Sequence, residues 1–276
     1  MEELRISSEG VNKVSFKSGR SVYRLIDTHA HLDEIENLEQ VITEARSANI
    51  IAIIGVGSDY ESNQKVLHLA QAYKGFVYPA IGWHPGHLKG SEIDRNLEFI
   101  EAHIGQAVGI GEVGLDYHKK VRAIAEKDLQ KYVLKEIFKI AKVYEKPVII
   151  HSRYAWRDAL NLVEEAKLQE VVFHWYTGTS SVLRDIVSQG YFISATPAVE
   201  YHEEHRRAVK EIPLDRLLLE TDSPVVYRRG SEFEYEAKPA DVLRVLRGVA
   251  GLRGVSEAQI AEITTANAVK LFGLQS

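Results

Sequence analysis

The sequence contains no cysteine. This absence excludes disulfides, thiolate zinc sites and a cysteine nucleophile, so a metal site in this chain must use histidine and carboxylate side chains. Long apolar runs are also missing, and none reaches the length that a bilayer-spanning helix needs. The first residues, Met1 to Arg24, are polar and mixed in charge, without the apolar segment of a secretory signal. We therefore expect a cytoplasmic protein that does not enter a membrane.

An excess of positive charge is absent as well. The formal net charge is -5, so a nucleic-acid substrate would need a local positive field. Hydrophobic residues make up 45% and charged residues 26%, which is typical of a globular protein. A length of 276 residues suits one eight-stranded β/α barrel.

Short β-branched runs alternate with longer helical patterns along the chain. The expected strands are Leu25–Thr28, Ile50–Val56, Val77–Gly82, Ala107–Ile110, Val148–Ile150, Val171–Phe173, Tyr191–Ser194 and Leu217–Leu219. Helical stretches between them include Leu38–Ala48, Tyr60–Tyr73, Ala123–Tyr144 and Trp156–Ala166. Apolar strands that alternate with helices are typical of a parallel sheet covered on both faces. The pattern predicts an α/β fold, a (β/α)8 TIM-type barrel in one domain over residues 25–276, with an open doubly wound sheet as the alternative.

Two segments lie outside the eight units. Val11–Leu25 has the alternation of a β-hairpin, and we expect this N-terminal extension, residues 1–24, to cover the amino end of the barrel. Ser256–Phe272 has the pattern of an extra C-terminal helix. Ser256 and Gln259 are spaced as a capping box, and Gly273 is a plausible helix stop.

Polar side chains gather where the predicted strands end. In a barrel these ends open on one face, where active sites lie. Buried polar groups are costly unless they are paired or bound to a metal, so their coincidence needs a common cause. The polar ends are Asp27 to His31, Trp83 to Pro85, Gly111 to Gly114, His151 to Arg153, His174 with Trp175, and Glu220 to Asp222.

His29 and His31 form the first candidate metal ligands. They are two residues apart, so their side chains point to the same side of one strand, together with Asp27. Imidazole and carboxylate groups suit Zn, Mn or Fe, and a carboxylate-rich site also suits Mg. Later strand ends carry further ligand types, namely Glu112, His151, His174 and Asp222. Together they predict a metal site; the alternatives are hydrogen-bonded core histidines, a salt-bridged Glu112 and a helix-capping Asp222.

Several longer motifs give the chain a resemblance to a known family. They are Asp27 to Asp33 (DTHAHLD), Gly109 to Tyr117 (GIGEVGLDY), Pro147 to Arg153 (PVIIHSR), Leu218 to Pro224 (LLETDSP) and Asn267 to Gly273. With these motifs in order, the chain resembles the TatD-related metal-dependent deoxyribonucleases, a branch of the amidohydrolase-like barrels. The resemblance implies a site for two divalent ions, of Zn, Mg or Mn. Its ligands would be His29, His31 and Asp222 for one ion, His151 and His174 for the other, and Glu112 as the bridge.

The chain departs from the family pattern near the expected substrate loops. His174-Trp175-Tyr176-Thr177-Gly178 stands where the family has His-Cys-Phe-x-Gly, and Leu134-x-x-Ile137 stands where Phe-x-x-Gln is usual. Glu236-Ala237-Lys238-Pro239 replaces Arg-Asn-Glu-Pro. No expected ligand is lost, so the departures concern the substrate rather than the metals.

The expected reaction is hydrolysis of phosphodiester bonds by a metal-activated hydroxide. Glu112 would fix the spacing of the ions, and Asp222 would also act as general base. The expected substrate is single-stranded DNA or a nucleic-acid end, cleaved as by an exonuclease; the oligomeric state stays open, with a monomer among the options. Candidate substrate contacts are His84, Arg153, Trp175 and Tyr117.

A ring of positive side chains on the loops of this face would supply the local field for phosphates, and predicts a steep loss of activity with added salt. The ring comprises Arg153, Arg157, Arg206, Arg207, Arg228, Arg229, His118, Lys119 and Lys120.

Two other functions stay open. One is an amidohydrolase that acts on an amide, ester or lactone with the same metals. Many such barrels bridge their metals with a carboxylated lysine on the fourth strand, whereas the fourth strand here ends in Glu112 and the next lysine is Lys119. The other is a non-catalytic metal-binding scaffold, which the presence of every expected ligand disfavours.

Overall fold

In the computed structural model, which describes residues 23–275, eight parallel strands form one sheet in chain order. They are β1 (Leu25–Ala30), β2 (Ile50–Val56), β3 (Val77–Ile81), β4 (Gly109–Asp116), β5 (Val148–Arg153), β6 (Val171–Phe173), β7 (Phe192–Ala195) and β8 (Leu217–Leu219). Hydrogen bonds join the end of β1 to the chain just after β8. The amide of His31 donates to the carbonyl of Ser223 at 2.7 Å, and the amide of Asp222 donates to that of His29 at 2.9 Å. The predicted (β/α)8 barrel is confirmed.

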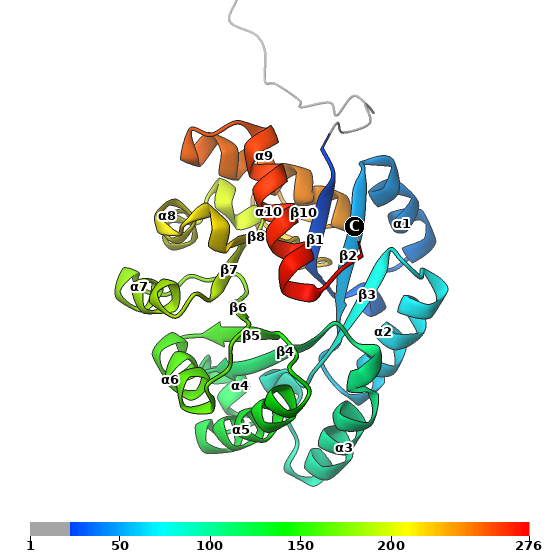
Figure 1. The fold of residues 1–276 in the computed structure, drawn as a ribbon, viewed down its shortest axis with the longest axis vertical. Helices are drawn as coiled ribbons and strands as arrows, with labels where there is room; N and C mark the ends of the chain where they lie inside the picture. Colours follow the sequence, from blue (N-terminus) through cyan, green and yellow to red (C-terminus); the bar gives the residue numbers. More distant parts are fainter. Residues whose placement is uncertain (1–22, 276) are drawn as a thin grey trace, which may run out of the picture.

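Helices surround the strands as an outer ring (Figure 1). The longer ones are α1 (Leu38–Ser47), α2 (Tyr60–Ala72), α3 (Ile93–His103), α5 (Lys127–Val143), α6 (Trp156–Ala166), α7 (Ser180–Ser188), α8 (Glu203–Glu211), α9 (Val242–Arg253) and α10 (Glu257–Phe272). After β8, β9 (Val226–Tyr227) and β10 (Tyr235–Glu236) pair as an antiparallel hairpin. No helix among the described residues is both long and apolar enough to cross a membrane.

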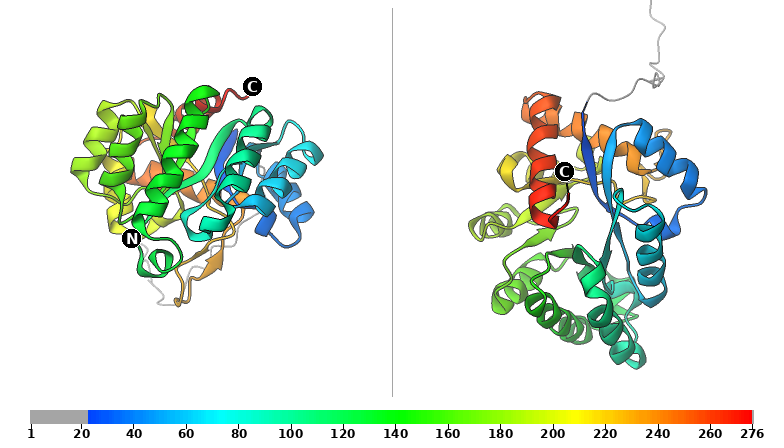
Figure 2. Two further views of the ribbon diagram at one scale, coloured as in Figure 1. Left: turned by 90° about the horizontal axis from the view of Figure 1, so that it is seen from below. Right: turned by 45° about the vertical axis from the view of Figure 1, so that its right-hand side comes forward.

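The apolar side chains form two main clusters because they alternate along the strands. In β2, Ile53 packs in the large cluster between the sheet and the helices, whereas Ile54 packs in a second cluster inside the barrel. Leu271 and Phe272 of α10 complete this inner cluster, so the C-terminal helix closes the amino end of the barrel. Figure 2 shows α10 and the β9–β10 hairpin at opposite ends of the molecule. The predicted N-terminal hairpin lies almost wholly outside the described residues.

Three strands are longer than the apolar pattern predicts, and the first of them, β1, continues to Ala30 rather than ending at Thr28. β4 begins at Gly109 rather than Ala107, and β4 and β5 continue to Asp116 and Arg153. Polar residues and glycine continue the ladder there, with Gly114 paired to His151. A Cβ on Gly114 would lie 1.9 Å from the carbonyl oxygen of His151, so this close approach of the strands requires glycine.

One predicted helix is shorter than expected. The pattern predicts a helix over Ala123–Tyr144, but the short α4 (Lys119–Arg122) ends first and α5 begins only at Lys127. Val121 is buried just before the break and Ala125 within it, so the apolar pattern continues where the helix does not. The C-terminal helix matches its prediction, since the Ser256 hydroxyl accepts from the amide of Gln259 at 3.3 Å.

Candidate metal centre

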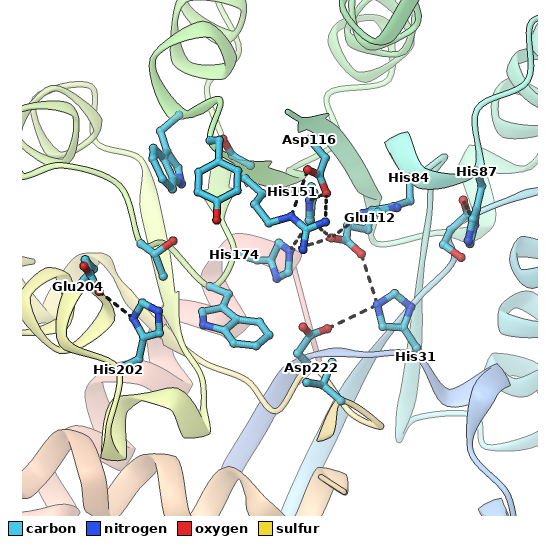
Figure 3. A pocket seen from close by; sticks show the side chains of 18 of the residues that line it. His31, His84, His87, Glu112, Asp116, His151, His174, His202, Glu204 and Asp222 are labelled. Atoms are coloured by element: carbon cyan, nitrogen blue, oxygen red, sulfur yellow. Dashed lines mark hydrogen bonds and ion pairs between the residues drawn. The ribbon is translucent and has the colours of Figure 1, made fainter. Parts of the chain in front are cut away.

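Four side chains from three strand ends converge at the carboxyl end of the barrel. The Nε2 atoms of His29 and His31 lie 3.4 Å apart. Both lie 3.5 Å from Oδ1 of Asp222, and they lie 3.6 and 3.3 Å from Oε2 of Glu112. Figure 3 shows His31, Glu112 and Asp222 pointing toward one another. The structure therefore brings together the residues that the sequence predicts for the first ion.

The separations test whether these four atoms suit one ion. Four ligands placed tetrahedrally about 2.1 Å from a zinc-like ion lie about 3.4 Å from one another. The five separations given above run from 3.3 to 3.6 Å. The set of two imidazole nitrogens and two carboxylate oxygens therefore fits a divalent ion in both chemistry and spacing.

Glu112 turns its other carboxylate oxygen to a second group. Oε1 lies 2.8 Å from Nδ1 of His151 and 2.7 Å from Nε2 of His174. These two nitrogens lie 3.4 Å apart. The two oxygens of Glu112 thus face different histidine pairs, which is the arrangement that a carboxylate between two ions needs.

The charge of the centre favours cations. Burial raises the pKa of Glu112, but the adjacent histidines, His174 first, outweigh burial and hold it well below the usual value. Burial lowers the pKa of His31 and of His174, yet the neighbouring carboxylates raise both well above the usual value. The histidines thus take up protons to balance the buried carboxylates. Divalent ions would supply the same positive charge and displace those protons.

Each histidine of the second group has a carboxylate on its other ring nitrogen. Nε2 of His151 lies 3.3 Å from Oδ2 of Asp116, and Nδ1 of His174 lies 3.3 Å from Oε1 of Glu220. Such pairs fix the orientation and the tautomer of the ring, so that the remaining nitrogen faces an ion. Strand alternation predicts this place for Glu220, whereas nothing in the sequence pattern assigns a role to Asp116.

A buried glutamine supports Asp116. Oε1 of Gln130, on α5, accepts from the amide of Asp116 at 2.8 Å, and Nε2 of Gln130 donates to the carbonyl of Asp116 at 3.0 Å. Gln130 shares one helical face with the buried Val133, Leu134 and Ile137. A polar residue on an otherwise apolar helix face is the sequence signal that could have revealed the role of Gln130.

Asp222 and Asp27 have different roles. Asp222 has a backbone φ of 50°, in the left-handed region, and the next element after it is the strand β9, so it is not a helix cap. Asp27 does not join the centre, although alternation places it on the side of His29. Its Oδ1 accepts from the amides of His29 at 3.3 Å and Thr221 at 2.9 Å. Asp27 therefore ties β1 to the end of β8.

The centre lies in a cleft of about 710 Å³, and His84, Arg153 and Trp175 are among the residues that line it. Nδ1 of His84 accepts from the amide of Gly86 at 3.0 Å, so the ring proton sits on Nε2, which lies 3.8 Å from Oε1 of Glu112. Burial lowers the pKa of His84 to about 3, and the ring is neutral. In this tautomer His84 donates a hydrogen bond toward the cleft, and its ligand atoms are also close enough to those of Glu112 and His151 to share an ion with them.

Tyr117 is the exception among the predicted substrate contacts. Its hydroxyl donates to Oδ2 of Asp158 at 2.6 Å, and Nζ of Lys127 lies 4.1 Å from the centre of its ring. Tyr117 directly follows Asp116, so alternation turns its side chain away from the centre that Asp116 faces. The structure places Tyr117 outside the cleft, contrary to the prediction.

The predicted ring of positive side chains is largely paired within the protein. The pairs include Arg153 with Asp116 and Arg157 with Asp185, both at 2.7 Å, Arg228 with Glu200 at 3.3 Å, and Arg206 with the carbonyl of Val199 at 2.7 Å. Arg153 alone among lysines and arginines lines the cleft, against five carboxylates: Glu34, Glu112, Asp116, Glu204 and Asp222. The sequence could not reveal these partners, because most lie far along the chain.

A TIM-type barrel with histidines and carboxylates at the carboxyl ends of its strands is the architecture of a metal-dependent hydrolase. The family described as TatD related DNase matches residues 26–273, and the chain belongs to this family. It is 33% identical to human deoxyribonuclease TATDN3 over 263 residues, which is 90% of this chain and 94% of that protein. It is 35% identical to the uncharacterized metal-dependent hydrolase YabD of Bacillus subtilis, over 90% of this chain and 98% of that protein.

Solved structures agree with this assignment. The crystal structure of YJJV, a TatD homologue from Escherichia coli K12, superposes with a TM-score of 0.82 at 28% identity. The superposition covers 91% of this chain and 99% of that protein. The resemblance that the motifs predict is therefore confirmed over nearly the whole barrel.

Proposed function

We propose that this chain is a metal-dependent hydrolase of phosphodiester bonds in DNA that works with two divalent ions. The observation that carries the proposal is the division of the Glu112 carboxylate, with Oε2 facing His29 and His31 and Oε1 facing the second histidine pair. Membership of the TatD-related family supports DNA as the substrate, as does the likeness to human deoxyribonuclease TATDN3.

The proposed ligands form two groups, one facing each carboxylate oxygen of Glu112. His29, His31 and Asp222 would hold one ion, His151 and His174 the other, and Glu112 would touch both. When bound, such ions would lower the pKa of a water nucleophile to about 7 and offset the charge of a phosphate. Asp222 lines the cleft, so its carboxylate is also placed to accept the proton that the attacking water loses.

His84 and Arg153 are the proposed contacts to the phosphate. The neutral His84 offers its Nε2–H to the cleft without adding positive charge beside bound ions. The side chain of Arg153 is 47% exposed, and Asp116 holds its guanidinium on one side through Nε at 3.1 Å and Nη2 at 2.7 Å. Both side chains would orient a phosphodiester, whose displaced oxygen leaves with the departing strand.

The charge of the cleft makes DNA binding depend on the ions. Five carboxylates face one arginine and the protonated histidines there, so the side chains alone give no excess of positive charge to attract a polyanion. A cleft of about 710 Å³ has the size of a small-molecule pocket and suits the end of a strand better than a duplex interior. We therefore propose that single-stranded ends are the preferred substrate, cleaved as by an exonuclease.

Replacing Asp222 by asparagine tests the proposal. Asp222→Asn keeps the size of the side chain but removes the proton acceptor and one charged ligand, so hydrolysis of a single-stranded DNA oligonucleotide should fall at least about a hundredfold. Asp185→Asn is the matched control, because Asp185 is 46% exposed and pairs with Arg157 outside the cleft. Both proteins and the wild type are assayed with Mg²⁺, Mn²⁺ and Zn²⁺ on DNA, RNA, a dipeptide and a lactone.

Two outcomes would count against the proposal. An Asp222→Asn enzyme with wild-type rates on DNA would remove Asp222 from the reaction. Wild-type protein that hydrolyses the dipeptide or the lactone but no nucleic acid, with any of the three ions, would replace the phosphodiester by an amide or ester substrate.

A further inference from the structure

One aromatic side chain at the cleft contributes little to the packing of the protein. Seven large apolar side chains are exposed in the described part of the chain, and Tyr154 alone among them lines the cleft. It is 61% exposed, and its hydroxyl makes no hydrogen bond to the residues that the structure describes. A side chain this exposed buries little apolar area and contributes little to the free energy of folding.

The backbone at Tyr154 is also unfavourable for a tyrosine. Its φ is 58°, in the left-handed region that glycine and asparagine adopt more readily than an aromatic residue. The residue connects β5 directly to α6, whose N-cap is Ala155. Residues held in such conformations cluster at binding sites, where the surrounding structure fixes the direction of the side chain.

Tyr154 has two aromatic neighbours and is still largely exposed. The ring of His118 lies nearly parallel to it, with centroids 6.4 Å apart, and Trp156 meets it edge-on at 6.0 Å. The same strand supplies His151 to the metal centre and Arg153 to the cleft wall. Three residues of extended chain span about 10 Å, so Tyr154 lies within reach of a base next to a phosphate held at the centre.

We propose that Tyr154 is a stacking platform for an unpaired nucleobase next to the cleaved phosphate. The proposal rests on the proposed function and names the part of the substrate that the metal centre does not contact. Stacking on an aromatic ring needs a base with a free face, which a base inside a duplex lacks. Tyr154 would thus contribute a preference for single-stranded DNA without reading its sequence.

The test compares Tyr154→Ala, Tyr154→Phe and the control Tyr132→Ala, in the full chain with added Mn²⁺. Tyr132 is 52% exposed on α5 and does not line the cleft. The substrates are a short single-stranded oligonucleotide and the same oligonucleotide with tetrahydrofuran abasic residues flanking the cleaved bond. Tyr154→Ala should raise KM for the first substrate about tenfold, within the roughly 5- to 150-fold range of one base stack, and leave kcat and the abasic substrate nearly unchanged. Tyr154→Phe keeps the stack and should behave as wild type, as should Tyr132→Ala.

The outcomes separate this inference from the proposed function. If wild type cleaves the oligonucleotide and Tyr154→Ala has the same KM on it, or loses equally on both substrates, Tyr154 is not a base platform. If wild type cleaves neither substrate, the proposed function fails and the stacking proposal falls with it.

Discussion

Asp116 offers the sharpest test of how the second ion would be held. Its Oδ2 lies 3.3 Å from Nε2 of His151, and this contact keeps the ring proton on Nε2 and leaves Nδ1 toward Glu112. In Asp116→Asn the carbonyl can keep the bond from the amide of His118, now 2.7 Å to Oδ1, and the new NH2 group then faces His151. The NH2 group favours the opposite tautomer of His151, with its proton on Nδ1, where it blocks a metal.

The size of the effect follows from these contacts. Loss of a carboxylate behind a ligand histidine costs about 10- to 100-fold in metal affinity, or roughly 1.4 to 2.7 kcal/mol. The other histidine pair contacts Asp222 and Glu112 rather than Asp116, so its affinity should change less than about threefold. Arg153 is 47% exposed and can recover water, which keeps the loss of folding stability modest.

Calorimetric titration of the metal-free protein with Mn²⁺ measures the affinity for each of the two ions. We expect wild type to bind two ions and Asp116→Asn to bind one of them with wild-type affinity and the other about 10- to 100-fold more weakly. Asp158→Asn is the control, because Asp158 accepts from a hydroxyl at 2.6 Å and an ammonium at 2.7 Å outside the cleft. Two unchanged affinities in Asp116→Asn, or an equal loss at both sites, would refute this reasoning.

Two further predictions concern pH and salt. Burial lowers the pKa of His205 from 6.5 to about 4, so this neutral histidine contributes stability that is complete above about pH 6.5 and is lost as the pH falls toward 4. The difference in unfolding free energy between wild type and His205→Gln, measured by urea unfolding, should therefore shrink by up to about 3 kcal/mol across that range. A difference that stays constant with pH would contradict this prediction. The pairing of the basic ring revises the expected salt dependence. With Arg153 as the one arginine in the cleft, log(kcat/KM) on single-stranded DNA should fall with log[NaCl] at a slope of about -0.7. Eight free lysines and arginines would give a slope of about -5.6.

The sequence predicts well which side chains converge at the centre, because their positions follow from strand periodicity. A residue at the carboxyl end of a barrel strand must face the same opening as its counterparts, so His151 and His174 meet although 23 residues separate them. Alternation also places Glu220 behind His174. The predictions concern regular backbone, where side-chain direction depends on local geometry alone.

Prediction fails where the backbone is irregular or the partner is distant in sequence. The register of β1 shifts between Asp27 and Ala30, so Asp27 is not turned with His29 into the centre. Past the end of β5 the direction of Tyr154 depends on the loop, so the sequence does not place this tyrosine at the cleft. Tyr117 is predicted there instead, although alternation from Asp116 turns it away. The partner of Arg153, Asp116, lies 37 residues away, so the sequence does not show that the charge of Arg153 is neutralised.

The central claim is that Glu112 joins two ions, and anomalous diffraction from crystals of the protein grown with Mn²⁺ tests it most directly. The account predicts two anomalous peaks per chain, one beside Oε2 of Glu112 with His29 and His31, and one beside Oε1 with His151 and His174. A single peak, or two peaks that do not share the Glu112 carboxylate, would contradict it.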